Sequence, residues 1–171
     1  MGTVIAIDPG IAVRGPGCAV ATFRDGVLVG VGFLRPSSSA RHIVGVTTVY
    51  EIPIVRPRED LSSGKANTLI KLAAAGAELA GRFGGCVVAV EPAAWKGSTP
   101  KPVSHSRIWS ALTDAERILF EPDTERRIEL AKRAGGLARW SKPGATYYGT
   151  WAGHNLLDAA GIGLHFLGRK S

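Results

Sequence analysis

Residues 3–10 read TVIAIDPG, and this stretch decides the fold class. Its β-branched residues favour a strand, which Pro9 and Gly10 bring to an end. Because the strand is apolar on both faces, we expect it at the centre of a sheet that is covered on both sides. Its last residue is Asp8, so the sequence places a carboxylate at one edge of the core.

The next two segments extend this strand into an antiparallel meander. Residues 17–24 and 27–34 are both rich in apolar and β-branched side chains, as strands are. Between them stands Asp25-Gly26, a pair typical of two-residue hairpin turns. The sequence therefore predicts three consecutive strands, each antiparallel to the one before it.

Two more strands and a long helix are predicted in the middle of the chain. Residues 47–55 look strand-like, but Pro53 argues against a central position in the sheet. Residues 63–83 carry apolar and small side chains at helical spacing. Residues 86–90 form a short apolar run typical of a buried strand, and this run leads directly into Glu91.

The C-terminal half is predicted to be largely helical. We expect a loop over residues 93–105, followed by short helices over 106–112, from a cap at Thr113 or Asp114 to before Pro122, and over 124–133. A loop over 137–153 and a final amphipathic helix over 155–167 complete the chain. A meander followed by alternating strands and helices is typical of an α/β fold with a mixed five-stranded sheet flanked by helices. The length of the chain predicts a single domain over residues 1–171.

The composition is that of a basic globular protein. Hydrophobic residues make up 45% and charged residues 20% of the chain, which argues against disorder. The formal net charge of +7 favours polyanionic partners such as nucleic acid. No apolar run approaches the roughly 18 residues that span a bilayer, and no signal peptide is visible. We therefore expect a cytoplasmic protein without a membrane partner.

Three acidic residues stand in unusual places. Asp8 and Glu91 each end an apolar strand, and Asp158 lies inside an otherwise apolar helix. Buried carboxylates are costly unless they are paired, hydrogen-bonded or bound to a cation. If the three converge, their hard oxygen ligands select Mg²⁺ or Mn²⁺. Such sites commonly hold two ions about 3.5–4 Å apart, which activate water and stabilise the leaving oxygen of a phosphodiester.

Each acid also has an ordinary explanation. Asp8 before Pro-Gly can be a turn residue, Glu91 can be a solvent-exposed strand end, and Asp158 can serve the helix macrodipole. If these acids form no metal site, all three ordinary explanations must hold at the same time. On the last helix, Asp158 shares a stripe with His154 and Gly161, which can direct the carboxylate toward the end of the sheet.

Three segments resemble motifs of one nuclease family. IDPGIAVRGPGCAV (residues 7–20) resembles the first motif of RuvC-type Holliday junction resolvases, and VVAVEPAAWKG (residues 87–97) resembles the strand that ends in their catalytic glutamate. HNLLDAAGIGLHFL (residues 154–167) resembles their C-terminal helix. The proline after Glu91 and the Trp-Lys-Gly that follows are closer to the small phage-type branch.

The resemblance implies an RNase H-like fold in which Asp8, Glu91 and Asp158 are catalytic and bind the metal. It also implies symmetric cleavage of four-way junction DNA by a homodimer, with two Mg²⁺ ions per site and Mn²⁺ as a substitute. Changing any of the three acids to its amide should then abolish cleavage while junction binding persists.

Two positions depart from the pattern of the family. Asn155 stands where the family has a fourth acidic ligand, three residues before Asp158. Its neighbour His154 could complete the metal site or carry protons, or it could be a surface residue at the start of the helix. Arg14 replaces a small hydroxyl residue in the first loop, where DNA contacts are expected.

Aromatic and basic residues near the second motif are candidates for DNA contacts. Residues 93–112 contain no acid. Trp95 could stack on an unpaired base, although a packing role fits it equally well. Lys96, Lys101 and Arg107 would neutralise phosphates. A second aromatic and basic cluster, for which packing is the favoured explanation, consists of Trp140, Lys142, Tyr147, Tyr148 and Trp151.

The sequence alone is compatible with three other functions. An RNase H-like nuclease could act on RNA–DNA hybrid or flapped DNA with the same carboxylates. A junction-binding module without activity is favoured by Asn155. An actin-like ATPase also ends its first strand in Asp-x-Gly, but it needs two such domains, and 171 residues give room for one.

Overall fold

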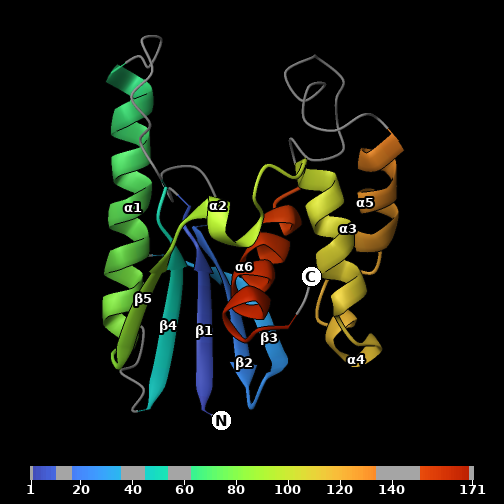
Figure 1. The fold of residues 1–171 in the computed structure, drawn as a ribbon, viewed down its shortest axis with the longest axis horizontal. Coiled ribbons are helices and arrows are strands. Elements are labelled where there is room, and N and C mark those ends of the chain that lie inside the picture. The colour runs from blue at the N-terminus through green and yellow to red at the C-terminus, as the bar shows by residue number, and fades with distance from the viewer. Residues whose placement is uncertain (1, 11–16, 36–44, 54–62, 134–150, 170–171) are drawn as a thin grey trace.

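A five-stranded mixed sheet with helices on both faces forms the protein (Figure 1). The computed structural model describes residues 2–10, 17–35, 45–53, 63–133 and 151–169. The strands are β1 (Thr3–Asp8), β2 (Cys18–Arg24), β3 (Val27–Leu34), β4 (Val46–Glu51) and β5 (Cys86–Val90). The helices are α1 (Ser63–Phe83), α2 (Pro92–Trp95), α3 (Lys101–Ala111), α4 (Asp114–Arg117), α5 (Thr124–Arg133) and α6 (Gly153–Phe166).

β1 lies at the centre of the sheet, as its apolar sequence predicts. The strand order is β3-β2-β1-β4-β5, in which β1, β2 and β3 are antiparallel and β1, β4 and β5 are parallel. Asp25 and Gly26, with φ angles of 50° and 84°, form the predicted turn between β2 and β3. The α/β fold class is confirmed, and the sheet is compatible with an RNase H-like topology.

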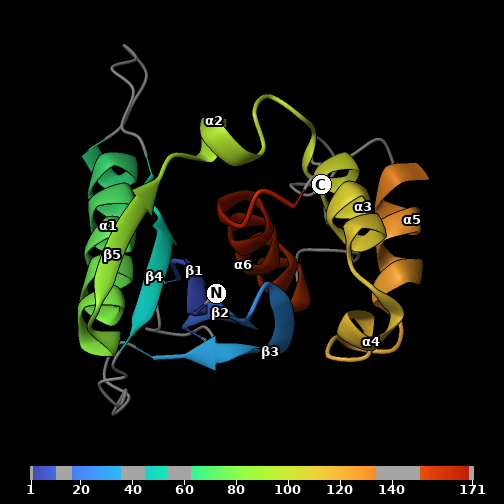
Figure 2. The ribbon, with the colours of Figure 1, turned by 60° about the horizontal axis from the view of Figure 1, so that its bottom comes forward.

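Successive residues of β1 pack on opposite faces of the sheet. Val4 and Ala6 belong to a core cluster with α6, whereas Ile5 and Ile7 belong to a second cluster with α1. Figure 2 shows α6 inside the curve of the sheet and α1 on the other face, beside β4. α3 packs on α6, and α5 packs on α3. Both faces of β1 are therefore covered.

Two strands differ from the expectation. Pro53 predicts a strand outside the centre, but β4 lies between β1 and β5. The strand ends at Glu51, so the proline two residues later removes no hydrogen bond from the ladder. β5 was predicted to be buried, but it is the edge strand among the described residues, and Cys86, Val87 and Ala89 are exposed. The reason is that α1 packs mainly against β4.

Two helices begin earlier than predicted. α3 begins at Lys101 instead of residue 106, because Pro102 lies in its first turn, where a missing N–H removes no hydrogen bond. α6 begins at Gly153. Residues 137–150 of the predicted aromatic loop lie outside the described residues. Within the described part of the chain, no helix is both long and apolar enough to cross a membrane.

Candidate active site

The carboxyl ends of β1 and β4 bring two acidic side chains together. The register pairs Ile7 with Tyr50, so the next residues, Asp8 and Glu51, end neighbouring parallel strands side by side. Neighbouring strands lie about 4.8 Å apart, and residues in register point to the same face. That face carries α6, because the residues two positions earlier in each strand belong to the core cluster around α6.

α6 supplies a third acid, Asp158, which is only 3% exposed. Asp8, Glu51 and Asp158 line one pocket of about 190 Å³ at this edge of the sheet. In Figure 1, the tips of β1 and β4 point toward the space between α1, α2 and α6. The other residues that line the pocket are Pro9, Pro53, Leu72, Lys96, Lys101 and Asn155.

Two residues of α3 hold Asp158. Lys101 Nζ lies 2.5 Å from Oδ2, and His105 Nε2 lies 3.0 Å from Oδ1. The two residues are four positions apart, so they share one face of α3. Burial on its own would raise the pKa of Asp158, but Lys101 and the His105 hydrogen bond outweigh burial and hold the pKa below its usual range. Asp158 is therefore ionised at neutral pH.

Both histidines near the pocket are neutral at neutral pH. Burial lowers the pKa of the fully buried His105. Burial and the charge of Lys101 lower the pKa of His154 to about 3. A neutral His105 donates its Nε2 proton to Asp158, and the Lys101 ammonium, 3.0 Å away, donates to Nδ1 of His154.

The charged form of Asp8 is disfavoured in this pocket. Burial raises its pKa well above the usual range, and the charges of Asp158 and Glu51 raise it further. Lys101 and Lys96 act in the opposite direction without cancelling the effect. An added cation would therefore stabilise the ionised form of Asp8.

Glu51 is anchored by Trp95 of α2 and by Lys96, the residue after it. Oε2 of Glu51 accepts a hydrogen bond from Trp95 Nε1 at 2.8 Å and another from Lys96 Nζ at 2.9 Å. Trp95 is buried and packs against Gly161 of α6, where a Cβ atom would lie 2.7 Å from the indole ring. A glycine at this position thus lets α2 approach α6 closely enough to hold Glu51.

The structure does not bring Glu91, the predicted second acid, to this pocket. Glu91 is exposed, precedes α2 as its N-cap residue and is not one of the residues that line the pocket. Val90, not Glu91, is in register with Glu51. Because side chains alternate along extended chain, Glu91 points to the opposite face, one strand farther from β1. Glu51 occupies the place that the sequence predicts for Glu91.

Glu51 and His105 were not among the predicted site residues. Glu51 ends the β-branched run VTTVYE (residues 46–51), which is the same pattern that identified Asp8. Pro53, two residues later, masks this pattern, because a proline argues against a central strand. His105 is four residues after Lys101 in the acid-free stretch, and its partner Asp158 lies 53 residues away.

The remaining predicted residues take different places. Trp95 is buried, so its ring is not open to a base in this structure. Arg107 is exposed on α3 and does not line the pocket, and Arg14 lies outside the described residues. Trp151, from the second aromatic cluster, is buried and donates to Glu121. Three predicted residues line the pocket beside the acids, namely Asn155, Lys96 and Lys101.

The donor atoms of the pocket suit a hard cation. Carboxylate oxygens and the amide oxygen of Asn155 are ligands that Mg²⁺ and Mn²⁺ prefer. In the present arrangement, no three His, Cys, Asp or Glu side chains of the described ranges are close enough to hold an ion. The ammonium groups of Lys96 and Lys101 serve as counter-cations instead. The chemistry of the pocket fits a metal, and lysines contact two of its three carboxylates.

Comparisons with known proteins assign no family to the chain. No protein-family model matches the sequence, and no curated protein matches it either. Function is therefore inferred from the fold and from the geometry of this pocket.

Proposed function

We propose that this protein is a divalent-metal-dependent endonuclease that cleaves branched DNA, with the four-way junction as its substrate. One observation carries the proposal: acidic side chains from β1, β4 and α6 line a single pocket at the edge of the sheet. The strand order, which is compatible with an RNase H-like topology, supports it. The choice of the junction as substrate depends on the motif resemblance.

The three acids would hold the metal, with Asn155 beside them. Bound Mg²⁺ or Mn²⁺, as one or two ions, supplies Lewis-acid activation of water and of the phosphodiester. His105 orients Asp158 through its 3.0 Å hydrogen bond, as partners behind metal ligands commonly do. Trp95 orients Glu51 in the same way through its indole N–H.

His154 fits a supporting role better than the role of a fourth ligand. Its Nδ1 accepts from Lys101, and its ring stacks over that of His105 with centroids 6.4 Å apart. A pKa of about 3 keeps the ring neutral at neutral pH, so its Nδ1 is able to accept a hydrogen bond. We therefore assign His154 to positioning Lys101 in the pocket.

Positive charge around the pocket suits a DNA backbone. Lys96 and Lys101 lie at the pocket itself, Arg107 is exposed on α3, and the whole chain carries a net charge of +7. Symmetric cleavage of a four-way junction requires two active sites related by a twofold axis. We therefore propose that the active form is a homodimer.

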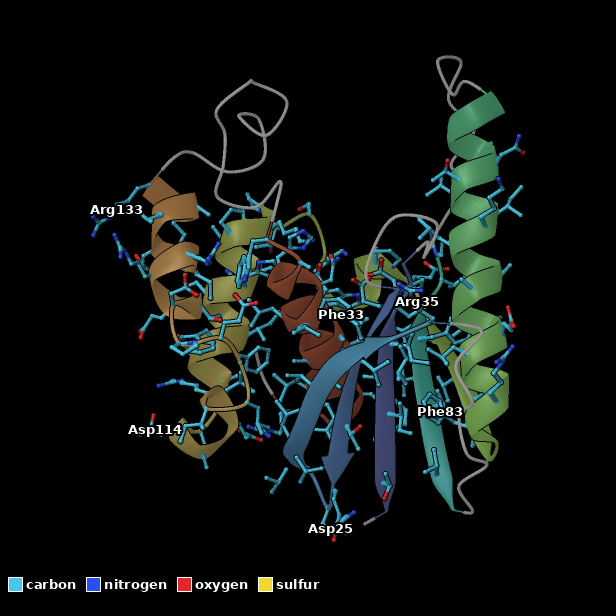
Figure 3. The ribbon with its side chains drawn as sticks, turned by 180° about the vertical axis from the view of Figure 1, so that it is seen from behind. Asp25, Phe33, Arg35, Phe83, Asp114 and Arg133 are labelled. Carbon is cyan, nitrogen blue, oxygen red and sulfur yellow. The ribbon has the colours of Figure 1, made fainter. Side chains whose placement is uncertain are left out.

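Cleavage of synthetic four-way junctions by wild type and by Asp8→Asn, with and without divalent metals, tests the proposal. Asp25→Asn is the matched control, because Asp25 is exposed at the β2–β3 turn, at the opposite end of the sheet from Arg35 (Figure 3). Wild type and Asp25→Asn should nick the junction in Mg²⁺ or Mn²⁺ and not in EDTA. Asp8→Asn should bind the junction without cutting it. Full activity of Asp8→Asn, or activity of wild type in EDTA, contradicts the proposal.

A substrate panel separates the junction from other targets. Duplex, flapped DNA and RNA–DNA hybrid are offered beside the junction under the same conditions. Equal cleavage of hybrid and junction would reject junction selectivity and keep the nuclease chemistry. Tight junction binding without cleavage in either metal would indicate a binding module instead.

A further inference from the structure

The lysines of the pocket contact the same acids that would hold the metal. Lys101 Nζ lies 2.5 Å from Oδ2 of Asp158, and Lys96 Nζ lies 2.9 Å from Oε2 of Glu51. A metal ion bound to these oxygens would stand within a few Å of an ammonium group, and two cations that close repel each other. Both cannot occupy the site in the present arrangement.

Lys101 is the more firmly placed of the two. Its ammonium contacts both Asp158 and Nδ1 of His154, and its side chain is 21% exposed. Lys96 lies over the ring of Trp95 at 4.6 Å from the centroid, and its side chain is 29% exposed. Both side chains reach solvent, so either flexible stem can move its ammonium out of the pocket without unfolding the protein.

We propose that the pocket takes up its divalent cation by exchange, in which Lys101 leaves Asp158 as the metal binds. Lys101 is then a tethered competitor that sets the affinity of the site for metal. Lys96 plays the same part at Glu51, with a smaller effect because its ion pair is more exposed. This inference rests on the proposed function, since it takes the pocket to be the metal site.

The exchange gives Lys101 two opposing effects. Without metal, the ammonium compensates the buried charge of Asp158 and so stabilises the folded protein. When metal is present, the same ammonium opposes binding. Removing it should therefore destabilise the metal-free protein and strengthen metal binding. A residue with a purely structural role would weaken both.

Calorimetric titration of the full chain with Mn²⁺ tests the exchange. The variants are Lys101→Met, Lys96→Met and, as the control, Lys132→Met. Lys132 lies on α5, pairs with Glu129 and is not one of the pocket residues, so this change removes the same charge elsewhere. We expect Mn²⁺ affinity to rise about ten-fold in Lys101→Met, a few-fold in Lys96→Met and less than about two-fold in Lys132→Met. The melting temperature of metal-free Lys101→Met should fall below that of wild type.

The outcomes separate this inference from the proposed function. In one outcome, Asp8→Asn loses Mn²⁺ binding, while Lys101→Met binds Mn²⁺ no more tightly than wild type. That result overturns the exchange but leaves the proposed metal site in place. If wild type and both lysine variants of the pocket fail to bind Mn²⁺, the exchange and the proposed function are both overturned. If Lys101→Met does not fold, the Mn²⁺ affinity of Lys96→Met tests the exchange instead. An affinity equal to that of wild type in this variant overturns the exchange.

Discussion

Two glutamates stand at the ends of neighbouring parallel strands, and one of them reaches the candidate active site. Glu51 ends β4 and Glu91 follows β5, each after a run rich in β-branched residues and each with a proline within two residues. Glu51 lines the pocket and accepts hydrogen bonds from Trp95 and Lys96. Glu91 is exposed at the start of α2. Two glutamates in similar local sequences therefore lie in different environments.

The difference lies in pairing and register. β4 pairs with β1, whereas β5 is one strand farther out, which adds about 4.8 Å to the distance from Asp8. The register also places Val90, not Glu91, beside Glu51. A shift of one residue turns a side chain to the other face of a sheet. A strand-end acid thus belongs to this site only if both strand order and register allow it.

The largest expected effect separates the two glutamates directly. Glu51→Gln removes a charge from the pocket and should lower the rate of junction cleavage by roughly a hundred- to a thousand-fold. Glu91→Gln changes an exposed side chain and should leave cleavage within about two-fold of wild type. Cleavage rates at saturating Mg²⁺, with all proteins at equal concentration, measure both effects.

Junction binding without metal is the control for this pair, and it should be unchanged in both variants. An inactive Glu91→Gln beside a fully active Glu51→Gln would mean that the end of β5, and not that of β4, completes the site. That result would overturn the assignment made from the register.

The fold could be predicted from the sequence where local chemistry decides it. The central place of β1 follows from its two apolar faces, and the β2–β3 hairpin follows from Asp25-Gly26. Asp8 and Asp158 could be found because a carboxylate in an apolar segment is costly without a partner. Each of these inferences uses only neighbours in the sequence.

The rest depends on contacts between distant segments. Whether β4 or β5 lies beside β1 depends on pairing between segments that are distant in the sequence, and no local pattern encodes that. The part played by His105 depends on Asp158, which is 53 residues away. The sequence is compatible with Trp95 as a surface aromatic or as a core residue. Its packing against Gly161, which lies far away in the sequence, makes it a core residue.

Glu116 extends the comparison from activity to stability. It is 1% exposed and accepts hydrogen bonds from Arg169 and from the backbone N–H groups of Leu28 and Thr113. These bonds, with that of Arg169 foremost, lower the pKa of Glu116 from its ordinary 4.5 to about 2. A carboxyl with a lowered folded pKa stabilises the protein above its unfolded pKa, and this contribution is lost as the pH falls from 4.5 toward 2.

Glu116→Gln should therefore lower the free energy of unfolding at pH 7 by about 3 kcal/mol. It should also flatten the decline of stability toward acid pH. The exposed Glu91→Gln should change the free energy by no more than about 0.5 kcal/mol. Urea denaturation of the three proteins at neutral and acid pH measures this, and parallel pH profiles for wild type and Glu116→Gln would contradict it.

The anchoring of Asp158 predicts a smaller loss. His105→Asn removes the hydrogen bond that orients this carboxylate, and it should lower both cleavage and Mn²⁺ affinity by about ten- to a hundred-fold. His165→Asn is the matched control, because His165 is exposed on the same helix as Asp158. A loss of thermal stability in His105→Asn with normal Mn²⁺ affinity would show that His105 serves packing alone.

The smallest expected effect tests how Glu51, unlike Glu91, is held in place. Trp95→Phe keeps an aromatic ring at α2 but removes the N–H that donates to Glu51 at 2.8 Å. Because the carboxylate of Glu51 itself is kept and only one hydrogen bond that orients it is lost, cleavage should fall by only about three- to ten-fold. Trp109→Phe is the control, since the indole N–H of Trp109 finds no acceptor among the described residues, and its loss should cost less than about two-fold. Equal losses in the two variants would mean that the N–H of Trp95 has no specific part in orienting Glu51. The hydrogen bonding that distinguishes the two glutamates would then reside in Lys96, the side chain that metal binding is expected to displace.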